Sequence, residues 1–460
     1  MKAVILAAGL GTKIWPYAEV RSKCATLVCN KPLVRRLAES LLKAGADGLV
    51  AVVGHHAQSV RGALFGLAAP VEFVHAPPAE GTALAVARAL EKLDDDEVVV
   101  AYGDITTSEE NVSRTIRAAR DADAPAMLVA RLDAVKSRPQ DFIDVRVRDD
   151  CVTEVVGHAR RSLGHVVGGV FAFRRAQALP YLLGNPGLVT RVEVGGMPPV
   201  EADLAQSIQM MVEAGQAVAA VEADECWCDL DKPWDIIAAN SKMVRYLAER
   251  APEDVIPSGC EIDDSSEVSG RIVMSPGSRI GKRCVVTGPL FLGPNSSIVN
   301  GSIVQGPIHI GRDCQVRHYC LLAGPALGDE CIVSHGAEFC WGVAFERVYF
   351  YHYCEIAGVV GACVDFGAAT VCGNLRFDDG DTIHRIKGRR EFPPDNADVA
   401  YFGDYSRTGV NAIIMPGVKT GAYSCVGPGV ILYEDLPSRK AVFAKQEQST
   451  IDWGPERYGW

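Results

Sequence analysis

Residues 1–32 read MKAVILAAGLGTKIWPYAEVRSKCATLVCNKP, and this stretch places an apolar strand directly before a glycine-rich turn. Gly9 and Gly11 let the backbone approach an anion and point its N–H groups toward it. Lys13 and Lys23 follow at a set distance and supply point charges for a triphosphate. No Gly-Lys-Ser/Thr follows the first glycine and no third glycine completes a dinucleotide fingerprint, so the two better-known phosphate loops are excluded. The stretch therefore predicts a phosphate site. The alternative is a turn whose glycines serve only packing, with both lysines on the surface.

Length and composition limit the possible functions. A chain of 460 residues is long for one core and predicts two or three domains. Its formal net charge of −11 argues against a nucleic-acid binder, so an anionic substrate must be met by local positive charge. The apolar run at the start is too short for a secretory signal, and nothing else reaches membrane-spanning length. We expect a cytoplasmic protein without membrane contact, whose 15 scattered cysteines are small buried hydrophobes.

From residue 1 to about 248, apolar strands alternate with helical stretches. This alternation is typical of an α/β domain, a mostly parallel sheet covered by helices, in which ligands bind beyond the carboxyl ends of the strands. Gly103 and Asp104 follow the apolar run 97–102 and are expected at such an end. An aspartate in this position is also a common turn or capping residue.

The opening stretch resembles the signature of the sugar-phosphate nucleotidyltransferases, L-A-A-G-x-G-T-R-M-x-P, then P-K-x-L-L-P-V, then K-P. The residues in register with it are Leu6, Ala7, Ala8, Gly9, Leu10, Gly11, Thr12, Pro16, Lys23, Val28, Lys31 and Pro32. Lys13 stands where the family has arginine, and Ser22 where it has proline. The resemblance implies a Rossmann-like, GT-A-like fold with Lys13 and Lys23 as catalytic residues.

The same resemblance assigns the rest of the predicted site. It implies that Asp104 holds Mg²⁺ together with Asp229, with Asp231 in reserve, from the element WCDLDKPWD at 227–235. The nucleotide is expected to contact Leu6, Ala8, Gly9, Leu10, Gly11, Thr12, Gly81, Thr82 and Gly103. The sugar is expected beside Gly169 and Glu201, whereas Gly157-His158 stands where the family has a Glu-Lys pair.

After a linker at 249–260, residues 261–460 have a different character, rich in small residues and poor in helical periodicity. Aliphatic or aromatic residues precede glycine at Ile280, Leu292, Ile310, Leu327, Val360, Phe366, Phe402 and Val426. Successive intervals are 12, 18, 17, 33, 6, 36 and 24, and five of the seven are multiples of six. A six-residue step with one inward aliphatic side chain predicts a triangular parallel β-helix of hexapeptide repeats. A glycine-rich β-sandwich is the alternative, although it has no reason to keep multiples of six.

This domain order resembles the bifunctional uridylyltransferases/acetyltransferases that make UDP-N-acetylglucosamine, in particular the archaeal members. The stretch FGAATVCGNLRFD at 366–378 carries the densest C-terminal similarity. The resemblance implies a left-handed β-helix, a trimer, acetyl-coenzyme A as a second substrate, and His352 as general base. An imidazole exchanges protons near neutral pH, which suits that task. Within the run YFYHY at 349–353, His352 is alternatively a packed member of an aromatic cluster.

Three functions follow. The leading one is an enzyme that condenses a nucleoside triphosphate with a sugar 1-phosphate, giving an NDP-sugar and pyrophosphate. The second adds N-acetylation of an amino-sugar phosphate from acetyl-coenzyme A in the β-helix. The third is a regulatory or scaffold subunit that binds sugar nucleotides without turnover. The retained Lys23 and Asp104 favour turnover.

Overall fold

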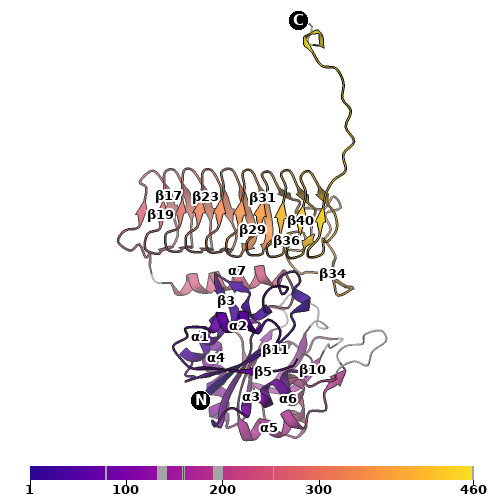
Figure 1. Cartoon of the computed structure of the whole chain (residues 1–460). Coiled ribbons are helices and arrows are strands. Elements are labelled where there is room, and N and C mark those ends of the chain that lie inside the picture. Colours follow the sequence, from indigo (N-terminus) through magenta and orange to yellow (C-terminus); the bar gives the residue numbers. More distant parts are fainter. Residues whose placement is uncertain are drawn as a thin grey trace.

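The computed structural model describes residues 1–77, 80–131, 142–157, 159, 161–189, 200–251 and 253–457. An α/β domain and a parallel β-helix lie one above the other, and a long helix, α7 (Asp235–Arg250), runs between them (Figure 1). Nothing among the described helices combines the length and hydropathy needed to cross a membrane.

The first domain is built on a nine-stranded mixed sheet. Its spatial order is β5 (Val71–His75), β4 (Leu49–Val53), β1 (Lys2–Ala7), β6 (Glu97–Tyr102), β11 (His165–Arg174), β8 (Ala126–Arg131), β14 (Ala219–Glu222), β10 (Cys151–Gly157) and β9 (Ile143–Arg148). β1 pairs in parallel with β4 and β6, while β11 runs antiparallel to β6 and β8. Strands β1 and β4 are apolar throughout almost their whole length because helices cover both faces of the sheet.

The helices of this domain follow the strands in α/β order. They are α1 (Leu33–Lys43), α2 (Ala57–Leu64), α3 (Thr82–Leu90), α4 (Glu109–Ala122), α5 (Arg175–Leu183) and α6 (Leu204–Glu213). Three short pairs supplement the sheet: β2 (Leu27–Val28) with β3 (Lys31–Pro32), β7 (Ile105–Thr106) with β15 (Cys228–Asp229), and β12 (Leu188–Val189) with β13 (Val200–Glu201). The β7–β15 pair brings the candidate metal ligands Asp104 and Asp229 close together.

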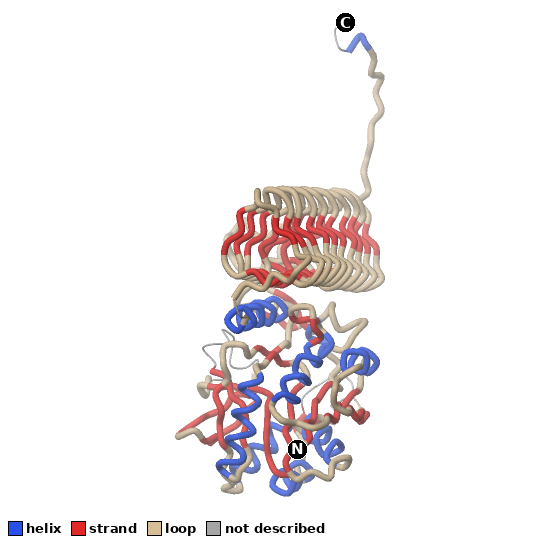
Figure 2. The backbone as a smooth tube through the Cα atoms, turned by 90° about the vertical axis from the view of Figure 1, so that its left-hand side faces the viewer, coloured by secondary structure: helices blue, strands red, loops and turns tan. Residues whose placement is uncertain are grey.

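The second domain is a parallel β-helix whose coils stack along one axis (Figure 2). One face consists of β16 (Glu261–Ile262), β19 (Arg279–Ile280), β22 (Ser297–Ile298), β25 (Gln315–Val316), β28 (Ile332–Val333), β30 (Tyr349–Phe350), β32 (Asp365–Phe366), β37 (Arg407–Thr408), β40 (Cys425–Val426) and β42 (Ala441–Val442). The other faces run from β17 (Glu267–Ser269) and β18 (Ile272–Met274) to β41 (Ile431–Leu432), and β29 (Glu338–Ala344) and β31 (Glu355–Val360) bend across both. One apolar column fills the interior.

The register explains the six-residue step and its exceptions. Arg279 pairs with Ser297 and Ser297 with Gln315, so the regular coils repeat every three hexapeptides, one for each side. The next two coils are each one residue shorter, because Gln315 pairs with Ile332 and Ile332 with Tyr349. The coil after them is two residues shorter, because Tyr349 pairs with Asp365. These shorter coils account for the irregular intervals of the sequence pattern.

The 36-residue interval between Phe366 and Phe402 is a multiple of six only by coincidence. The 36 residues from Phe366 to Phe402 enclose an insertion with a hairpin, β34 (His384–Ile386) and β35 (Arg389–Glu391), so they are not two regular coils. The two phenylalanines lie on different faces, in β32 and β36 (Ala400–Phe402). The boundaries 1–248, 249–260 and 261–460 remain a prediction; α7 ends at Arg250, and Val255 already forms a parallel bridge with Val273 of the β-helix.

Candidate active site

The glycine-rich turn leaves β1 at the carboxyl edge of the sheet. Gly11 has φ +64°, and a Cβ there would lie 3.0 Å from the Cβ atoms of both Ala18 and Lys23, so glycine is required by conformation and by space. A Cβ on Gly9 would meet nothing within 4 Å. The backbone at Gly9 therefore faces open space, as an anion-binding turn requires.

Both predicted lysines point into this edge of the sheet. Lys23 Nζ lies 2.9 Å from Asp104 Oδ2 and 3.5 Å from Asp231 Oδ1, and only 12% of its side chain is exposed. Lys13 Nζ donates a hydrogen bond to Asp231 Oδ2 at 3.0 Å. Burial opposes the charge of Lys23, but Asp104, Asp231 and Asp229 outweigh it and hold the lysine pKa well above its usual value. The ammonium of Lys23 is thus fixed among carboxylates.

The pairing of β7 with β15 brings the predicted metal ligands together. Asp229 lies opposite Ile105, the residue after Asp104, and Leu230 N donates to Asp104 O at 2.9 Å. Burial, with the nearby carboxylates of Asp104 and Asp231, raises the pKa of Asp229 to about 8 although Lys23 opposes this. Asp229 is half-buried and has no ion pair within the described structure.

Asp231 plays a different part from Asp229. Burial opposes its ionisation, yet Lys23, Lys13 and Lys232 lower its pKa to about 2. The Asp235 carboxylate accepts hydrogen bonds from the backbone N–H groups of Asp231 and Lys232, at 2.9 and 2.6 Å, and so holds this loop in shape. Asp231 is therefore the shared counter-charge of the lysines.

The donor set suits a hard cation that completes its coordination elsewhere. No group of three or more potential ligand side chains gathers within the residues described. Asp104 and Asp229 offer two neighbouring carboxylates, and Mg²⁺ keeps several waters and phosphate oxygens when bound to one or two such groups. The uncompensated Asp229 fits this use.

The other predicted nucleotide and sugar residues line the same edge. Gly103 N donates to Leu6 O at 2.9 Å, and Gly169 has φ +78° beside Tyr102 and Ile105. A Cβ on Gly81 would lie 2.3 Å from Ala202 O, so glycine allows the close approach of the segment that follows Glu201.

Thr82 has a structural contact that its sequence did not indicate. Its Oγ1 accepts a hydrogen bond from Leu204 N at 2.7 Å and so satisfies the start of α6. Glu201 is half-buried in β13 and directly precedes Ala202, the residue that contacts Gly81. The predicted exchange at Gly157-His158 cannot be placed, because His158 lies outside the described residues.

His352 lies apart from these residues, on a corner of the β-helix. Its Nδ1 is 2.8 Å from Nδ1 of His335, whose Nε2 is 2.9 Å from the Tyr353 hydroxyl. The Tyr351 ring packs edge-on against His352, with ring centroids 4.7 Å apart. The histidine therefore belongs to an aromatic cluster and at the same time forms a polar chain with its neighbours.

His335 was missed from the sequence, although a signal existed. It precedes His352 by the length of one of the shorter coils, the same interval that separates Ile332 from its partner Tyr349, so the repeat itself stacks the two histidines. Arg21, Asp404 and Glu391, described below, had no such signal because their partners lie in the other domain.

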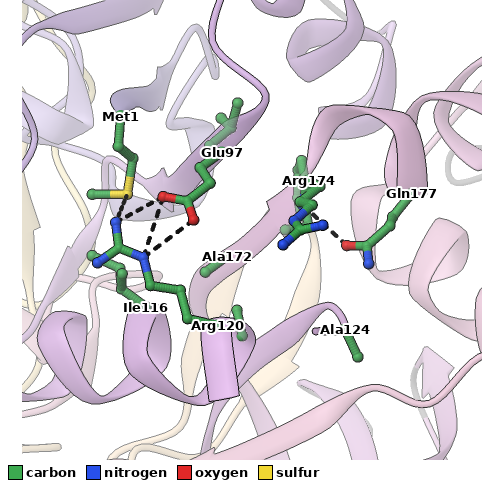
Figure 3. A pocket seen from close by; sticks show the side chains of 11 residues that line it. Met1, Glu97, Ile116, Arg120, Ala124, Ala172, Arg174 and Gln177 are labelled. Carbon is green, nitrogen blue, oxygen red and sulfur yellow. Dashed lines mark hydrogen bonds and ion pairs between the residues drawn. The ribbon is translucent and has the colours of Figure 1, made fainter. Parts of the chain in front are cut away.

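A separate pocket lies at the opposite end of the sheet (Figure 3). Glu97, which begins β6, accepts from Arg120 of α4 within it, whereas Asp104 follows the end of the same strand. The residues lining it are Met1, Glu97, Val98, Ile116, Ala119, Arg120, Ala124, Ala172, Phe173, Arg174 and Gln177. None of them is a predicted site residue, so this pocket is distinct from the candidate active site.

Comparison with known proteins agrees with this geometry. Residues 2–142 match the family model described as "Nucleotidyl transferase". The matched residues run from β1 through β8 of the first domain. The whole chain is 25% identical over 438 residues to a bifunctional sugar-1-phosphate nucleotidylyltransferase/acetyltransferase of Sulfurisphaera tokodaii, covering 95% of this chain and 98% of that protein.

Two further similarities were found. The bifunctional protein GlmU of Methanocaldococcus jannaschii is 26% identical over 450 residues, covering 97% of this chain and 98% of the relative. A UDP-glucose pyrophosphorylase structure from Acinetobacter baumanii covers 54% of this chain and 94% of its own, at 17% identity and a TM-score of 0.44. The predicted resemblance to the bifunctional family, the fold class and the assignment of a nucleotidyltransferase are confirmed.

Proposed function

We propose that the protein joins a nucleoside triphosphate to a sugar 1-phosphate and releases pyrophosphate. The observation that supports this most strongly is the convergence of Lys13, Lys23, Asp104 and Asp229 beside the open backbone at Gly9. The similarity of nearly the whole chain to a sugar-1-phosphate nucleotidylyltransferase points the same way. Leu6, Ala8, Leu10 and Thr12 would contact the nucleotide around this turn.

In this proposal an oxygen of the sugar phosphate attacks the α-phosphorus, and the bond from that phosphorus to the β-phosphate oxygen breaks. The electron pair of the broken bond leaves with pyrophosphate. Lys23 would neutralise charge on the α-phosphate, while backbone N–H groups near Gly11 and the ammonium of Lys13 would hold the β- and γ-phosphates. Mg²⁺ on Asp104 and Asp229 would supply charge neutralisation at the phosphates.

The other predicted residues fit the remaining parts of the substrates. Gly81, Thr82 and Gly103 would line the base and ribose side, and Gly169 and Glu201 the sugar side. Gly81 and Thr82 are joined through Ala202 and Leu204 to the segment that follows Glu201, which places the two sides next to each other.

The test is pyrophosphate release from panels of nucleoside triphosphates and sugar 1-phosphates, with and without Mg²⁺. We expect one pair to react, and Asp104→Asn and Asp229→Asn each to lower the rate at a given Mg²⁺ concentration. If nucleotide binds and no pair reacts, the protein is a binding subunit rather than an enzyme.

A second activity, acetyl transfer from acetyl-coenzyme A to an amino-sugar phosphate, is favoured by the chain His352–His335–Tyr353. His352 would take a proton from the amine as the amine nitrogen bonds to the acetyl carbon. The carbon–sulfur bond of the thioester would then break, and the sulfur would leave with the electron pair and accept a proton to become the coenzyme thiol. In a trimer formed through the β-helix this corner would face a neighbouring subunit. Thiol release that is lost in His352→Asn, and light scattering at the mass of a trimer, would support this. Thiol release that persists in His352→Asn would contradict it.

A further inference from the structure

The segment between the two active-site lysines lies against the β-helix. A mixed apolar cluster joins the two domains there, and it includes Ile14 and Tyr17 from this segment together with Phe345 and Val359 of the β-helix. Tyr17 is fully buried, its hydroxyl donates to Val359 O at 2.7 Å, and its ring meets Phe345 edge-on. A segment that would hold substrate phosphates is thus packed on the other domain.

Arg21 provides a charged contact two residues before Lys23. Its guanidinium donates to Asp404 Oδ1 and lies 5.0 Å from the centre of the Phe345 ring. Asp404 is completely buried at a turn of the β-helix, and its Oδ1 also accepts from Ala362 N at 2.7 Å. A buried carboxylate that already has a backbone donor gives the arginine one fixed place.

Glu19 adds a third contact in the same stretch. Its Oε2 accepts hydrogen bonds from Ala422 N, at 2.9 Å, and from the Ser438 hydroxyl. Tyr17, Glu19 and Arg21, all between Lys13 and Lys23, therefore each contact the β-helix. Alternate residues of the segment thus contact the β-helix, so the segment that carries the two lysines is itself held by the other domain.

The opposite side of the site has a similar contact. Lys232, which follows Asp231, lies 3.3 Å from Glu391 on the β34–β35 hairpin and 3.7 Å from Asp231. The Trp234 ring packs against His384 of the same hairpin, with centroids 5.1 Å apart. The β-helix thus contacts both the lysine segment and the aspartate loop.

We propose that the β-helix is a positioning element of the nucleotidyl transferase site, and that Arg21 and Asp404 are positioning residues which hold Lys13 and Lys23 toward the triphosphate. This inference rests on the proposed function. It predicts that breaking the pair lowers the use of nucleotide in an enzyme that remains folded, because misplacement of a positioned group slows the reaction. An interface that only joins domains would lower thermal stability and leave the kinetics unchanged.

The experiment compares full-length Arg21→Met, Asp404→Asn and their double variant with the wild type. We expect each single variant to lower kcat/KM for the nucleotide by about tenfold, and the double variant to be no worse than the poorer single one. Arg21→Lys keeps the charge and should recover part of the loss. KM for the sugar phosphate should stay at the wild-type value.

Arg271→Met is the matched control. Arg271 is another arginine across the interface, and it donates to Ala248 O near the far end of α7, roughly 20 Å from the aspartate loop. Its loss should affect thermal stability alone. Kinetics of Arg21→Met equal to those of the wild type, or an equal kinetic loss in Arg271→Met, would overturn the inference.

Amide hydrogen exchange over residues 12–22 separates this inference from the proposed function. Faster exchange there in Arg21→Met supports the anchoring even if the wild type releases no pyrophosphate from any substrate pair. Unchanged exchange in an active enzyme refutes the anchoring and leaves the proposed function intact.

Discussion

At the scale of single residues, the two glycines of the opening turn do different work. Gly11 is fixed by its positive φ and by two Cβ atoms at 3.0 Å, whereas the space beside Gly9 is open. Gly11 is needed for the turn to fold, whereas Gly9 leaves space for an anion to approach the backbone. Substitution separates these roles.

Gly9→Ala should weaken nucleotide binding without changing thermal stability. The added methyl group meets no protein atom, but it occupies the space through which phosphate would approach the backbone. Calorimetric titration with the preferred triphosphate and a thermal melt would check this. Gly62→Ala serves as the control, because a Cβ on Gly62 would meet nothing within 4 Å and the backbone there does not have a positive φ. Gly45 also has open space, but its positive φ would strain an alanine. A normal Kd in Gly9→Ala would contradict the placement of the phosphates.

Lys23→Met should lower kcat by roughly 100- to 1000-fold, as expected for the loss of a group that stabilises charge in the transition state. The ammonium is buried among Asp104 and Asp231, so a neutral side chain also leaves these carboxylates uncompensated. Lys43→Met removes an exposed lysine paired with Glu109 and should leave the rate unchanged. Pyrophosphate release measures both. A rate for Lys23→Met near that of the wild type would remove this residue from the catalytic set.

At the scale of elements, the β-helix depends on an aromatic column. Phe366 is fully buried, and its ring lies 5.4 Å from that of Phe350 and 4.8 Å from that of Phe402. These rings fill coils that are shorter than the regular ones or interrupted by the hairpin insertion. The column therefore packs the least regular part of the domain.

Phe366→Ala should lower the free energy of unfolding of the β-helix by about 3–5 kcal/mol, because it leaves a cavity between rings that have no room to collapse. Phe377→Ala, at a fully exposed phenylalanine of the neighbouring loop, should change it by less than about 0.5 kcal/mol. Urea unfolding followed by circular dichroism would measure both variants. Equal losses would show that the column is not the stabilising core.

The sequence pattern predicted the elements better than their exceptions. The end of the apolar run 97–102 indicated where Asp104 lies, whereas Asp229 was predicted only from the family resemblance, and both remain predicted metal ligands. The β7–β15 pair brings the two together although Ile105 and Asp229 are far apart in the sequence. The six-residue step predicted the β-helix, yet it could not distinguish two regular coils from a stretch of the same length that contains a hairpin. Inward side chains recur at a fixed interval in the sequence, whereas an insertion whose length is a multiple of six residues does not disturb that interval and cannot be detected from it.

At the scale of the whole molecule, the contacts between domains were not predictable. Arg21 and Asp404 are 383 positions apart, and Lys232 meets Glu391 from a hairpin that the repeat pattern did not reveal. Neither residue type nor spacing identifies such partners, because each charge has many potential counter-charges in a chain of this length. Periodicity indicated the two domains separately but carried no information on their docking.

Asp404 makes this docking dependent on pH. Burial raises its pKa to about 6, although Arg21 opposes the shift, and Glu346 is the other charged group that faces it. Because the pKa of this acid is higher in the folded than in the unfolded state, its stabilising contribution is complete below about pH 4 and is lost as pH rises through 6. A difference of this size corresponds to about 3 kcal/mol.

Asp404→Asn cannot ionise and avoids this loss. The Tm of the variant minus the Tm of the wild type should therefore increase between pH 4 and pH 7, while all other titrations cancel in the difference. Thermal melts at four pH values in that range would measure it. A difference that stays constant with pH would show that Asp404 is ionised throughout and that its carboxylate is better compensated than the contacts indicate.

The ion pairs of Asp231 affect which anions can bind to the lysines of the unliganded protein. Lys13 and Lys23 each already face a carboxylate, so an incoming phosphate has to displace an internal competitor before it can gain either lysine. A lone inorganic phosphate or sulfate offers one anionic centre for that exchange, whereas a triphosphate chain offers several joined together. Under the proposed function, Asp231, together with Asp104 at Lys23, therefore favours the long anion over the abundant short ones.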